Sequence, residues 1–321
     1  MARVDLSGKR VLVPLPLTEA QKEDFRGLVE GAGGSVSFVR EQFVRDRDTQ
    51  DVSLIIGNVP ARTLHGSPEL EWLQTSSAGY DHYLAPGVLA PQTVLTNATG
   101  AYGQAVSEHM LAQLLCLMKK LHQYRDNQGK GRWHDEGRVT SLVGATVLVL
   151  GAGDIGTSFA RLVSALGASV IGVRRRAGEC REPFARMAPM DELYELLPQA
   201  DVVASVLPSS DATRGLADAR LFASMRKGSY FVNAGRGDLV VSADLVSALS
   251  SGHLAGAALD VTSPEPLPSD DPLWSEPNAL ITPHVAGFWH LQATTDNVVA
   301  LCRANLVAYL AGEPLRNLVA R

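Results

Sequence analysis

Short runs of β-branched and aliphatic residues alternate along the chain with stretches in which apolar positions recur at helical spacing. Such runs are typical of buried parallel strands, and the amphipathic stretches are typical of the helices that connect them. Near the N-terminus, residues 18–30 predict an amphipathic helix. The strands that the pattern predicts in the first hundred residues are 10–13, 35–39, 53–57, 72–75 and 94–97.

The alternation continues after a long helix, which we predict from the apolar positions between residues 101 and 123. This helix would cross from a first domain to a second one. A final helix over 292–310 would return to the first domain, which is therefore expected to be discontinuous. The predicted strands of the second domain are 147–150, 169–173, 201–206, 230–232, 257–259 and 279–281.

A glycine-rich turn separates the first strand of the second domain from the helix after it. Gly151, Gly153 and Gly156 have G-x-G-x-x-G spacing. The first permits a sharp turn, the second lets a pyrophosphate approach the backbone, and the third lets helix and strand pack closely. Free N–H groups and the positive dipole end at the helix start would hold the phosphates. With the next strand, this turn predicts a dinucleotide-binding βαβ unit.

These elements predict an α/β protein of two domains. A doubly wound parallel sheet of the Rossmann type is expected over residues 100–287, as the dinucleotide-binding domain. Residues 1–99 with 288–321 are expected to form a smaller, flavodoxin-like α/β domain that binds the substrate. The C-terminal strand ends of the larger sheet would all face one ligand crevice.

Composition narrows the function classes. A chain of 321 residues, 45% hydrophobic and 20% charged, is typical of a soluble protein with two ordinary domains. The net charge of −5 does not favour binding of nucleic acid. No apolar run approaches the roughly 20 residues of a membrane span. Cys116, Cys180 and Cys302 lack metal-ligand spacing and favour a reducing compartment. We therefore expect a cytoplasmic protein with no metal and no nucleic-acid or membrane partner.

The end of the second strand of the βαβ unit bears on the choice of cofactor. A unit that binds NAD places Asp or Glu there, to bind the ribose hydroxyls. This chain has Arg174, Arg175 and Arg176 instead. Guanidinium groups bind a 2′-phosphate through charge-assisted hydrogen bonds, so NADP is predicted in preference to NAD. The alternative is that the three arginines form only a solvated strand edge.

Three ionisable residues follow predicted strands of the second domain: Arg236, Glu265 and His284. An arginine can anchor a carboxylate and polarise a carbonyl, and a histidine can transfer a proton near neutral pH. A carboxylate bonded to the other imidazole nitrogen would fix the tautomer. The set fits hydride transfer between a nicotinamide and a 2-hydroxy acid, although each residue taken singly is more often a surface group.

Together these motifs resemble the D-isomer-specific 2-hydroxyacid dehydrogenase family over nearly the whole chain. The resemblance implies that Arg236, Glu265 and His284 are catalytic, and that backbone N–H groups of Ala78 and Gly79 bind the substrate carboxylate. Asp260 is similar to an aspartate that contacts the nicotinamide carboxamide. The further cofactor-binding residues that the resemblance implies are Asp154, Ile155, Leu207, Pro208, Thr213, Ala234, Gly235, Ala286 and Gly287.

The resemblance also implies an activity and an assembly. Arg174 departs from NAD-using members and is similar to the NADP-using glyoxylate and hydroxypyruvate reductases. We therefore expect an NADP-dependent reductase of a small 2-oxo acid, and a homodimer formed through the helix at 101–123. Two alternatives stay open: a dinucleotide-sensing, co-repressor-like binding protein, and an NAD-linked dehydrogenase of another small anion, such as formate or phosphite. Phe288 and Trp289 either wall the substrate pocket or pack in the core.

Overall fold

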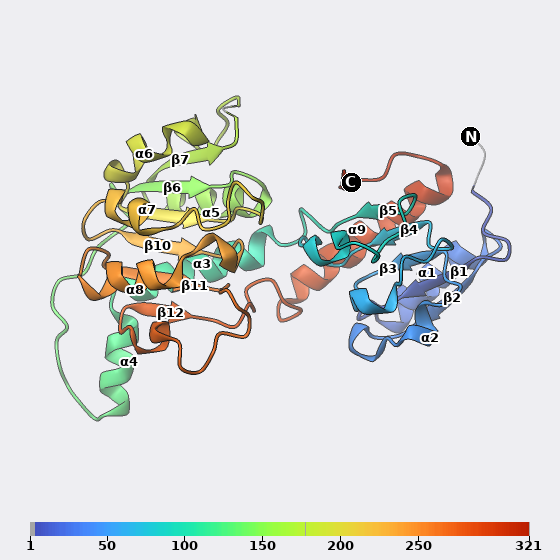
Figure 1. Ribbon diagram of the computed structural model, residues 1–321, viewed down its shortest axis with the longest axis horizontal. Helices are drawn as coiled ribbons and strands as arrows, with labels where there is room; N and C mark the ends of the chain where they lie inside the picture. Colours follow the sequence, from blue (N-terminus) through green and yellow to red (C-terminus); the bar gives the residue numbers. More distant parts are fainter. Residues whose placement is uncertain (1–3, 177, 321) are drawn as a thin grey trace. The chain divides into compact units, whose positions relative to one another are not determined.

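The computed structural model describes residues 4–176 and 178–320. The chain divides into two compact units, one formed by the residues up to Tyr102 with those from Leu291 on, the other by Gly103–His290 (Figure 1). Residues 1–3 and 321, the ends of the first predicted domain, lie outside the described residues. No helix in the described part of the chain combines the length and the apolar character needed to cross a membrane.

The first unit is built on a parallel sheet of five strands. Their order is β2-β1-β3-β4-β5, which is the order of flavodoxin-like folds. The buried strands carry an apolar core on which Tyr83 and the connecting loops pack. The strand bounds are β1 (Arg10–Val13), β2 (Ser35–Phe38), β3 (Leu54–Ile56), β4 (Trp72–Gln74) and β5 (Val94–Thr96), each within one or two residues of the prediction.

The helices α1 (Glu19–Glu30) and α9 (Gln292–Ala311) belong to this unit, although they come from opposite ends of the chain (Figure 1). Arg303 of α9 makes two hydrogen bonds to the carboxylate of Asp24 on α1. Tyr309 stacks on the fully buried Trp72 of β4, with ring centroids 5.1 Å apart. The last helix therefore packs on the sheet formed by the first hundred residues and belongs to the same unit. The short α2 (Asp46–Thr49) follows β2.

The second unit contains a seven-stranded parallel sheet in the order β12-β11-β10-β9-β6-β7-β8. Counted from β6, this is the Rossmann order 3-2-1-4-5-6 with one further strand, so the predicted fold class is confirmed. The strand bounds are β6 (Thr146–Leu150), β7 (Ser169–Arg174), β8 (Arg186–Pro189), β9 (Val202–Ser205), β10 (Tyr230–Asn233), β11 (Gly256–Leu259) and β12 (Ala279–Ile281).

The sequence analysis missed β8. This strand pairs only with β7 and forms the edge of the sheet. It begins with an exposed arginine and ends in a proline, so it lacks the apolar run that marks the central strands. An edge strand needs fewer buried side chains than a central one, and its pattern is correspondingly weak.

Helices cover both faces of the larger sheet. The helix α3 (Gly103–Met118) packs against α5 (Asp154–Ala165) and against β10 and β11. On the opposite face lie α6 (Leu193–Leu196), α7 (Ala219–Ser224) and α8 (Ser242–Ser250) (Figure 1). The side chains of these three helices and of the strands form one apolar core, which includes Phe222 and Phe231 in edge-to-face contact.

The prediction of one long helix over residues 101–123 is wrong. The chain leaves α3 at Met118, Lys120 has a left-handed backbone with φ of 56°, and a separate helix α4 (Leu121–Gly129) begins. The carbonyl of Met118 accepts the N–H of Thr140, and the ammonium of Lys119 bonds the Thr140 carbonyl. The segment at Thr140 thus occupies the Met118 carbonyl, which a continuous helix would have used for its own hydrogen bond. Periodicity does not reveal such a contact.

Candidate active site

Every site residue predicted in the second unit lies at or after the C-terminal end of a strand in the seven-stranded sheet. Because all these strands are parallel, their C-terminal ends lie along one edge. The strand order reverses between β6 and β9, and such switch points are where doubly wound sheets bind their ligands. The predicted residues therefore lie on the loops of this edge.

The glycine turn after β6 has the geometry of a phosphate-binding turn. Gly151 has φ of 99°, a conformation that favours glycine. A Cβ on Gly156 would lie 2.0 Å from the Gly151 carbonyl oxygen, so only glycine lets helix and strand approach this closely. Gly153 is the N-cap of α5 without a side-chain cap, and a Cβ there would meet nothing within 4 Å. The turn is closed on its protein side and open at Gly153, and the helix begins at Asp154 and Ile155.

Arg174 is the last residue of β7, and Arg175 and Arg176 follow in a bend. All three side chains are exposed. Their position, at the end of the strand next to β6, is where the ribose of a bound dinucleotide is held in this fold.

Two glycines let the loops of neighbouring strands approach one another. A Cβ on Gly235, after β10, would lie 2.5 Å from the carbonyl oxygen of Leu207, after β9. A Cβ on Gly237 would lie 1.8 Å from the carbonyl oxygen of Thr262, after β11. The predicted cofactor loops thus touch through backbone. Three further residues of the predicted cofactor loops are held by hydrogen bonds. Thr213 Oγ1 donates to the Pro208 carbonyl, and the N–H of Ala234 donates to the Ser205 carbonyl.

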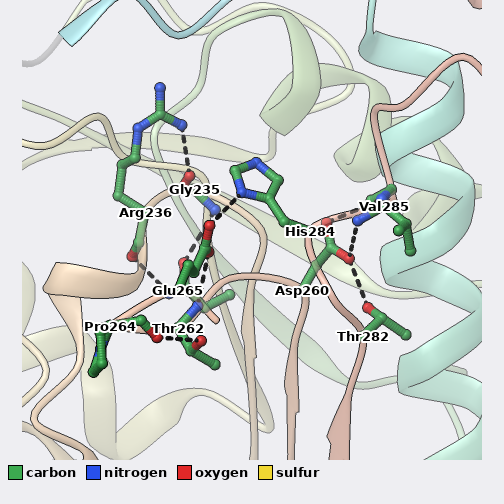
Figure 2. Close-up of polar contacts among 11 residues, drawn as sticks. Gly235, Arg236, Asp260, Thr262, Pro264, Glu265, Thr282, His284 and Val285 are labelled. Carbon is green, nitrogen blue, oxygen red and sulfur yellow. Dashed lines mark hydrogen bonds and ion pairs between the residues drawn. The ribbon is translucent and has the colours of Figure 1, made fainter. Parts of the chain in front are cut away.

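Glu265 and His284 form a direct pair. Nδ1 of His284 lies 2.8 Å from Oε2 of Glu265, while Oε1 of Glu265 accepts the N–H of Thr262 at 3.1 Å. Figure 2 shows the carboxylate directed at the imidazole. A carboxylate only accepts hydrogen bonds, so Nδ1 carries the hydrogen and Nε2 is left for another partner. The His284 side chain is 51% exposed, and the second nitrogen is therefore accessible from solvent.

Arg236 lies on the loop after β10, beside the Thr262 to Glu265 loop (Figure 2). Its guanidinium donates to the Gly235 carbonyl at 2.8 Å, and its own carbonyl accepts from the amide of Asn233 at 2.9 Å. These bonds fix both ends of the residue. The structure therefore brings Glu265 and His284 into contact and places Arg236 on the adjacent loop.

Asp260 is buried, with 3% of its surface exposed, and it organises the loop that carries His284. Its two carboxylate oxygens accept the N–H groups of Val285 and Ala286, each at 3.0 Å. Oδ1 also accepts the hydroxyl hydrogen of Thr282 at 2.6 Å. The contact of Asp260 with a nicotinamide stays a prediction. The contacts described here show that Asp260 also holds the backbone of the His284 loop.

Sequence reasoning missed two residues beside this site. His109 and Gln113 of α3 both reach the hydroxyl of Thr282, at 2.9 and 3.1 Å. Their i, i+4 spacing places them on one face of the helix, which is the signal that could have drawn attention to them. Phe288 follows the His284 loop. Its side chain is 55% exposed and lies against His290, so it is not packed in the core.

The predicted carboxylate-binding loop lies in the first unit, directly after β4. Asn58 Oδ1 accepts the N–H of Ser76, and Ser77 Oγ donates its hydrogen to the Gly79 carbonyl at 2.6 Å, with Asn58 Oδ1 3.3 Å away. The N–H groups of Ala78 and Gly79 have no acceptor in the described part of the chain. Two adjacent free N–H groups in a fixed loop are suited to an anion.

The model of the D-isomer specific 2-hydroxyacid dehydrogenase NAD-binding domain matches residues 111–286, more than half of the chain. The chain belongs to this family. Membership makes it an oxidoreductase that uses a nicotinamide dinucleotide, and the matched region contains the glycine turn and the loops of Arg236, Glu265 and His284.

Relatives in this family match both units. The chain is 30% identical to a glyoxylate/hydroxypyruvate reductase B of Escherichia fergusonii, over 80% of each chain. It is similar in structure to a family protein from Aeromonas salmonicida, with a TM-score of 0.84, 31% identity and 98% and 99% of the two chains covered. An NADPH-dependent glyoxylate/hydroxypyruvate reductase from Sinorhizobium meliloti, solved with NADP and sulfate, gives 0.79 at 26% identity, with 97% and 98% covered.

Proposed function

We propose that the protein reduces a small 2-oxo acid, such as glyoxylate or hydroxypyruvate, with NADPH. The observation that carries the proposal is the His284–Glu265 pair, in which a 2.8 Å hydrogen bond occupies Nδ1 and leaves Nε2 on an exposed imidazole. An imidazole oriented in this way is a general acid for a carbonyl oxygen and a general base in the reverse direction. The negative charge of Glu265 favours the protonated imidazole that reduction requires.

The second unit, which we propose as the dinucleotide-binding domain, fits the cofactor. The N-terminus of α5 lacks a side-chain cap, and space at Gly153 is open, so a pyrophosphate can accept the helix N–H groups there. When bound, the nicotinamide supplies the hydride. The loops at Leu207, Pro208 and Thr213, at Ala234 and Gly235, and at Ala286 and Gly287 are proposed to hold the rest of the dinucleotide along the same edge.

Substrate binding is proposed to use Arg236 and the backbone of Ala78 and Gly79. The planar guanidinium of Arg236 matches a carboxylate, and its charge stabilises the oxyanion that develops during reduction. The free N–H groups of Ala78 and Gly79 are proposed to donate hydrogen bonds to a substrate carboxylate. Phe288, half exposed, is proposed to wall the pocket with its neighbour Trp289.

The preference for NADP is supported by the exposed guanidinium groups of Arg174, Arg175 and Arg176 at the end of β7. The Sinorhizobium meliloti relative was solved with NADP, which favours the same choice. Replacing Arg174 by Asp should move the preference in kcat/KM from NADPH toward NADH, because an acid repels the 2′-phosphate and binds the ribose hydroxyls. An unchanged ratio would argue against this role of the arginine.

The test of the activity is a spectrophotometric panel of 2-oxo acids with NADPH and NADH. Steady oxidation of NADPH with glyoxylate or hydroxypyruvate supports a reductase, whereas binding of NADPH without turnover supports a sensing protein. His284→Ala should lose most turnover and keep its NADPH affinity, since the imidazole acts on the substrate. Arg236→Lys should raise the substrate KM and lower kcat, because the bidentate geometry is lost. Wild-type turnover in either variant contradicts the assigned role.

The homodimer is also a proposal. Apolar side chains lie exposed on α4 and the segment after it: Leu121 is 54% exposed, Val143 77%, and Trp133 fully exposed. A surface of this kind is more typical of an interface than of a free helix. Sedimentation of the wild type and of Trp133→Ser tests it, with the dimer weakened in the variant.

A further inference from the structure

A polar network joins α3 to the loop of His284. Its centre is the hydroxyl of Thr282, which follows β12 directly and lies 2.6 Å from Oδ1 of Asp260. Nε2 of His109 lies 2.9 Å from that hydroxyl oxygen, and Nε2 of Gln113 lies 3.1 Å from it. His109 and Thr282 are 173 residues apart in sequence, so this link exists only in the folded unit.

The hydrogens of this network can be assigned by counting. A hydroxyl has one hydrogen and two lone pairs, and a carboxylate has no hydrogen to give. Thr282 therefore donates to Asp260, and both of its lone pairs accept, one from Gln113 and one from His109. His109 must carry a hydrogen on Nε2. Gln113 is likewise a donor, because its Nε2 is directed at the Thr282 hydroxyl. Its Oε1 is buried without a partner in the described part of the chain.

The backbone of the His284 loop depends on the orientation of Asp260. His284 has φ of 54°, a left-handed conformation that costs free energy for any residue except glycine. Its N–H donates to the Asp260 carbonyl at 2.8 Å, and the next two N–H groups donate to Oδ1 and Oδ2. The two carboxylate oxygens can accept these bonds only in one orientation, and the Thr282 hydroxyl bonded to Oδ1 contributes to fixing it.

We propose that His109 and Thr282 are positioning residues for the reaction. The N–H of His109 directs the hydroxyl hydrogen of Thr282 at Asp260, Asp260 holds the three consecutive N–H groups of residues 284–286, and the imidazole of His284 is thereby aimed at the substrate. This role goes beyond the cofactor contact predicted for Asp260. The inference rests on the proposed function, because it matters to turnover only if His284 transfers the proton.

The first test compares three variants of the full chain. Thr282→Val keeps the shape and removes the hydroxyl, and it should lower kcat about tenfold with the substrate KM changed less than about threefold. Thr282→Ser keeps the hydroxyl and should retain kcat within about twofold. Thr140→Val is the matched control, since Thr140 Oγ1 bonds the Tyr230 hydroxyl at 2.9 Å elsewhere in the unit. It should lower the unfolding midpoint comparably and leave kcat unchanged.

The second test addresses His109 and also covers the case that Thr282→Val does not fold. His109→Leu removes the donor and should lower kcat severalfold, whereas His109→Gln supplies an N–H at a similar reach and should restore it. In the double variant His109→Leu/Thr282→Val, kcat should equal that of Thr282→Val alone, because both act through one hydroxyl. Independent, multiplying losses would overturn the proposed relay.

The outcomes separate the two proposals. If His284→Ala keeps wild-type turnover, the proposed function fails. If His284→Ala is inactive while His109→Leu and Thr282→Val keep wild-type kcat, only the positioning role fails. A loss of kcat in Thr140→Val equal to that in Thr282→Val would likewise overturn it, since the loss would then reflect stability alone.

Discussion

Both units contain a parallel strand followed by a turn and a helix, β1 and α1 in the first and β6 and α5 in the second, but the two helices are capped in different ways. In the first unit, Thr18 caps α1: its hydroxyl accepts the N–H of Gln21, and the Gln21 side chain accepts the N–H of Thr18 at 2.9 Å. In the second unit, the N-cap of α5 is Gly153, which offers no side chain. One helix start has a side-chain cap from the protein itself, and the other has none.

The difference shows that topology alone does not make a dinucleotide site. Both sheets are parallel, and α1 and α5 each present a positive dipole end at their start. In the first unit, Pro14 and Pro16 lie between β1 and α1, and a capping box uses the N–H groups of Thr18 and Gln21. In the second unit, the space at Gly153 is open and the helix start has no side-chain cap, which suits the pyrophosphate proposed to bind there. The choice between a structural turn and a binding turn is made by a few residues.

The largest expected effect tests the closed side of the glycine turn. Gly156→Ala places a Cβ 2.0 Å from a backbone oxygen, so the helix must move and the free energy of unfolding should fall by about 3 kcal/mol or more. Chemical denaturation measures this. Gly27→Ala in α1 is the control, because a Cβ there meets nothing within 4 Å, and it should stabilise by about 0.5–1 kcal/mol. Equal behaviour of the two variants would contradict the steric argument.

The next largest effect is expected from a substitution at Gly153, on the open side of the turn. It should change the affinity for NADPH and not the stability of the fold. In Gly153→Val the added Cβ meets no protein atom within 4 Å, so the unfolding midpoint should stay close to that of the wild type. The side chain occupies the approach to the helix N–H groups, and the Kd for NADPH should rise about a hundredfold or more. Fluorescence titration measures the Kd. Wild-type affinity in this variant would show that the pyrophosphate does not bind at Gly153.

A substitution at the cap of α1 should have a smaller effect, on stability and not on NADPH affinity. Thr18→Ala removes the side-chain acceptor of the Gln21 N–H and should cost about 1 kcal/mol of stability without changing NADPH affinity. Thr18→Ser retains the oxygen and should behave as the wild type. A change in NADPH affinity in Thr18→Ala would mean that the two helix starts are not separate in function.

The smallest effect concerns charge at the C-terminal strand edge of the first sheet. Burial raises the pKa of Glu41, which follows β2, and a hydrogen bond with Asn58 only partly opposes this. A raised pKa in the folded state means that the stabilisation is complete below the unfolded-state pKa and is lost as pH rises through the folded one. Glu41→Gln should therefore unfold at a higher temperature than the wild type near neutral pH, with the difference vanishing in acid. A difference that grows in acid would contradict the sign.

Much of this protein could be predicted from local pattern. The bounds of β1, the strand ends of the larger sheet and the glycine turn follow from runs of buried side chains and from the backbone freedom of glycine, both of which act over a few residues. Arg236, Glu265 and His284 could be selected because each follows such a run. The resemblance then supplied their roles, which stay proposals here.

Only the tertiary structure decided the rest. The break at Lys120 follows from a bond between Met118 and Thr140, the approach of Gly237 to Thr262 joins two loops, and His109 meets Thr282 across 173 residues. None of these contacts has a period or a spacing in the sequence, because each depends on how separate elements pack. Local pattern determined most of the elements and their ends, but not β8 or the break between α3 and α4. Packing determined which side chains meet there, and so how the imidazole of His284 is aimed.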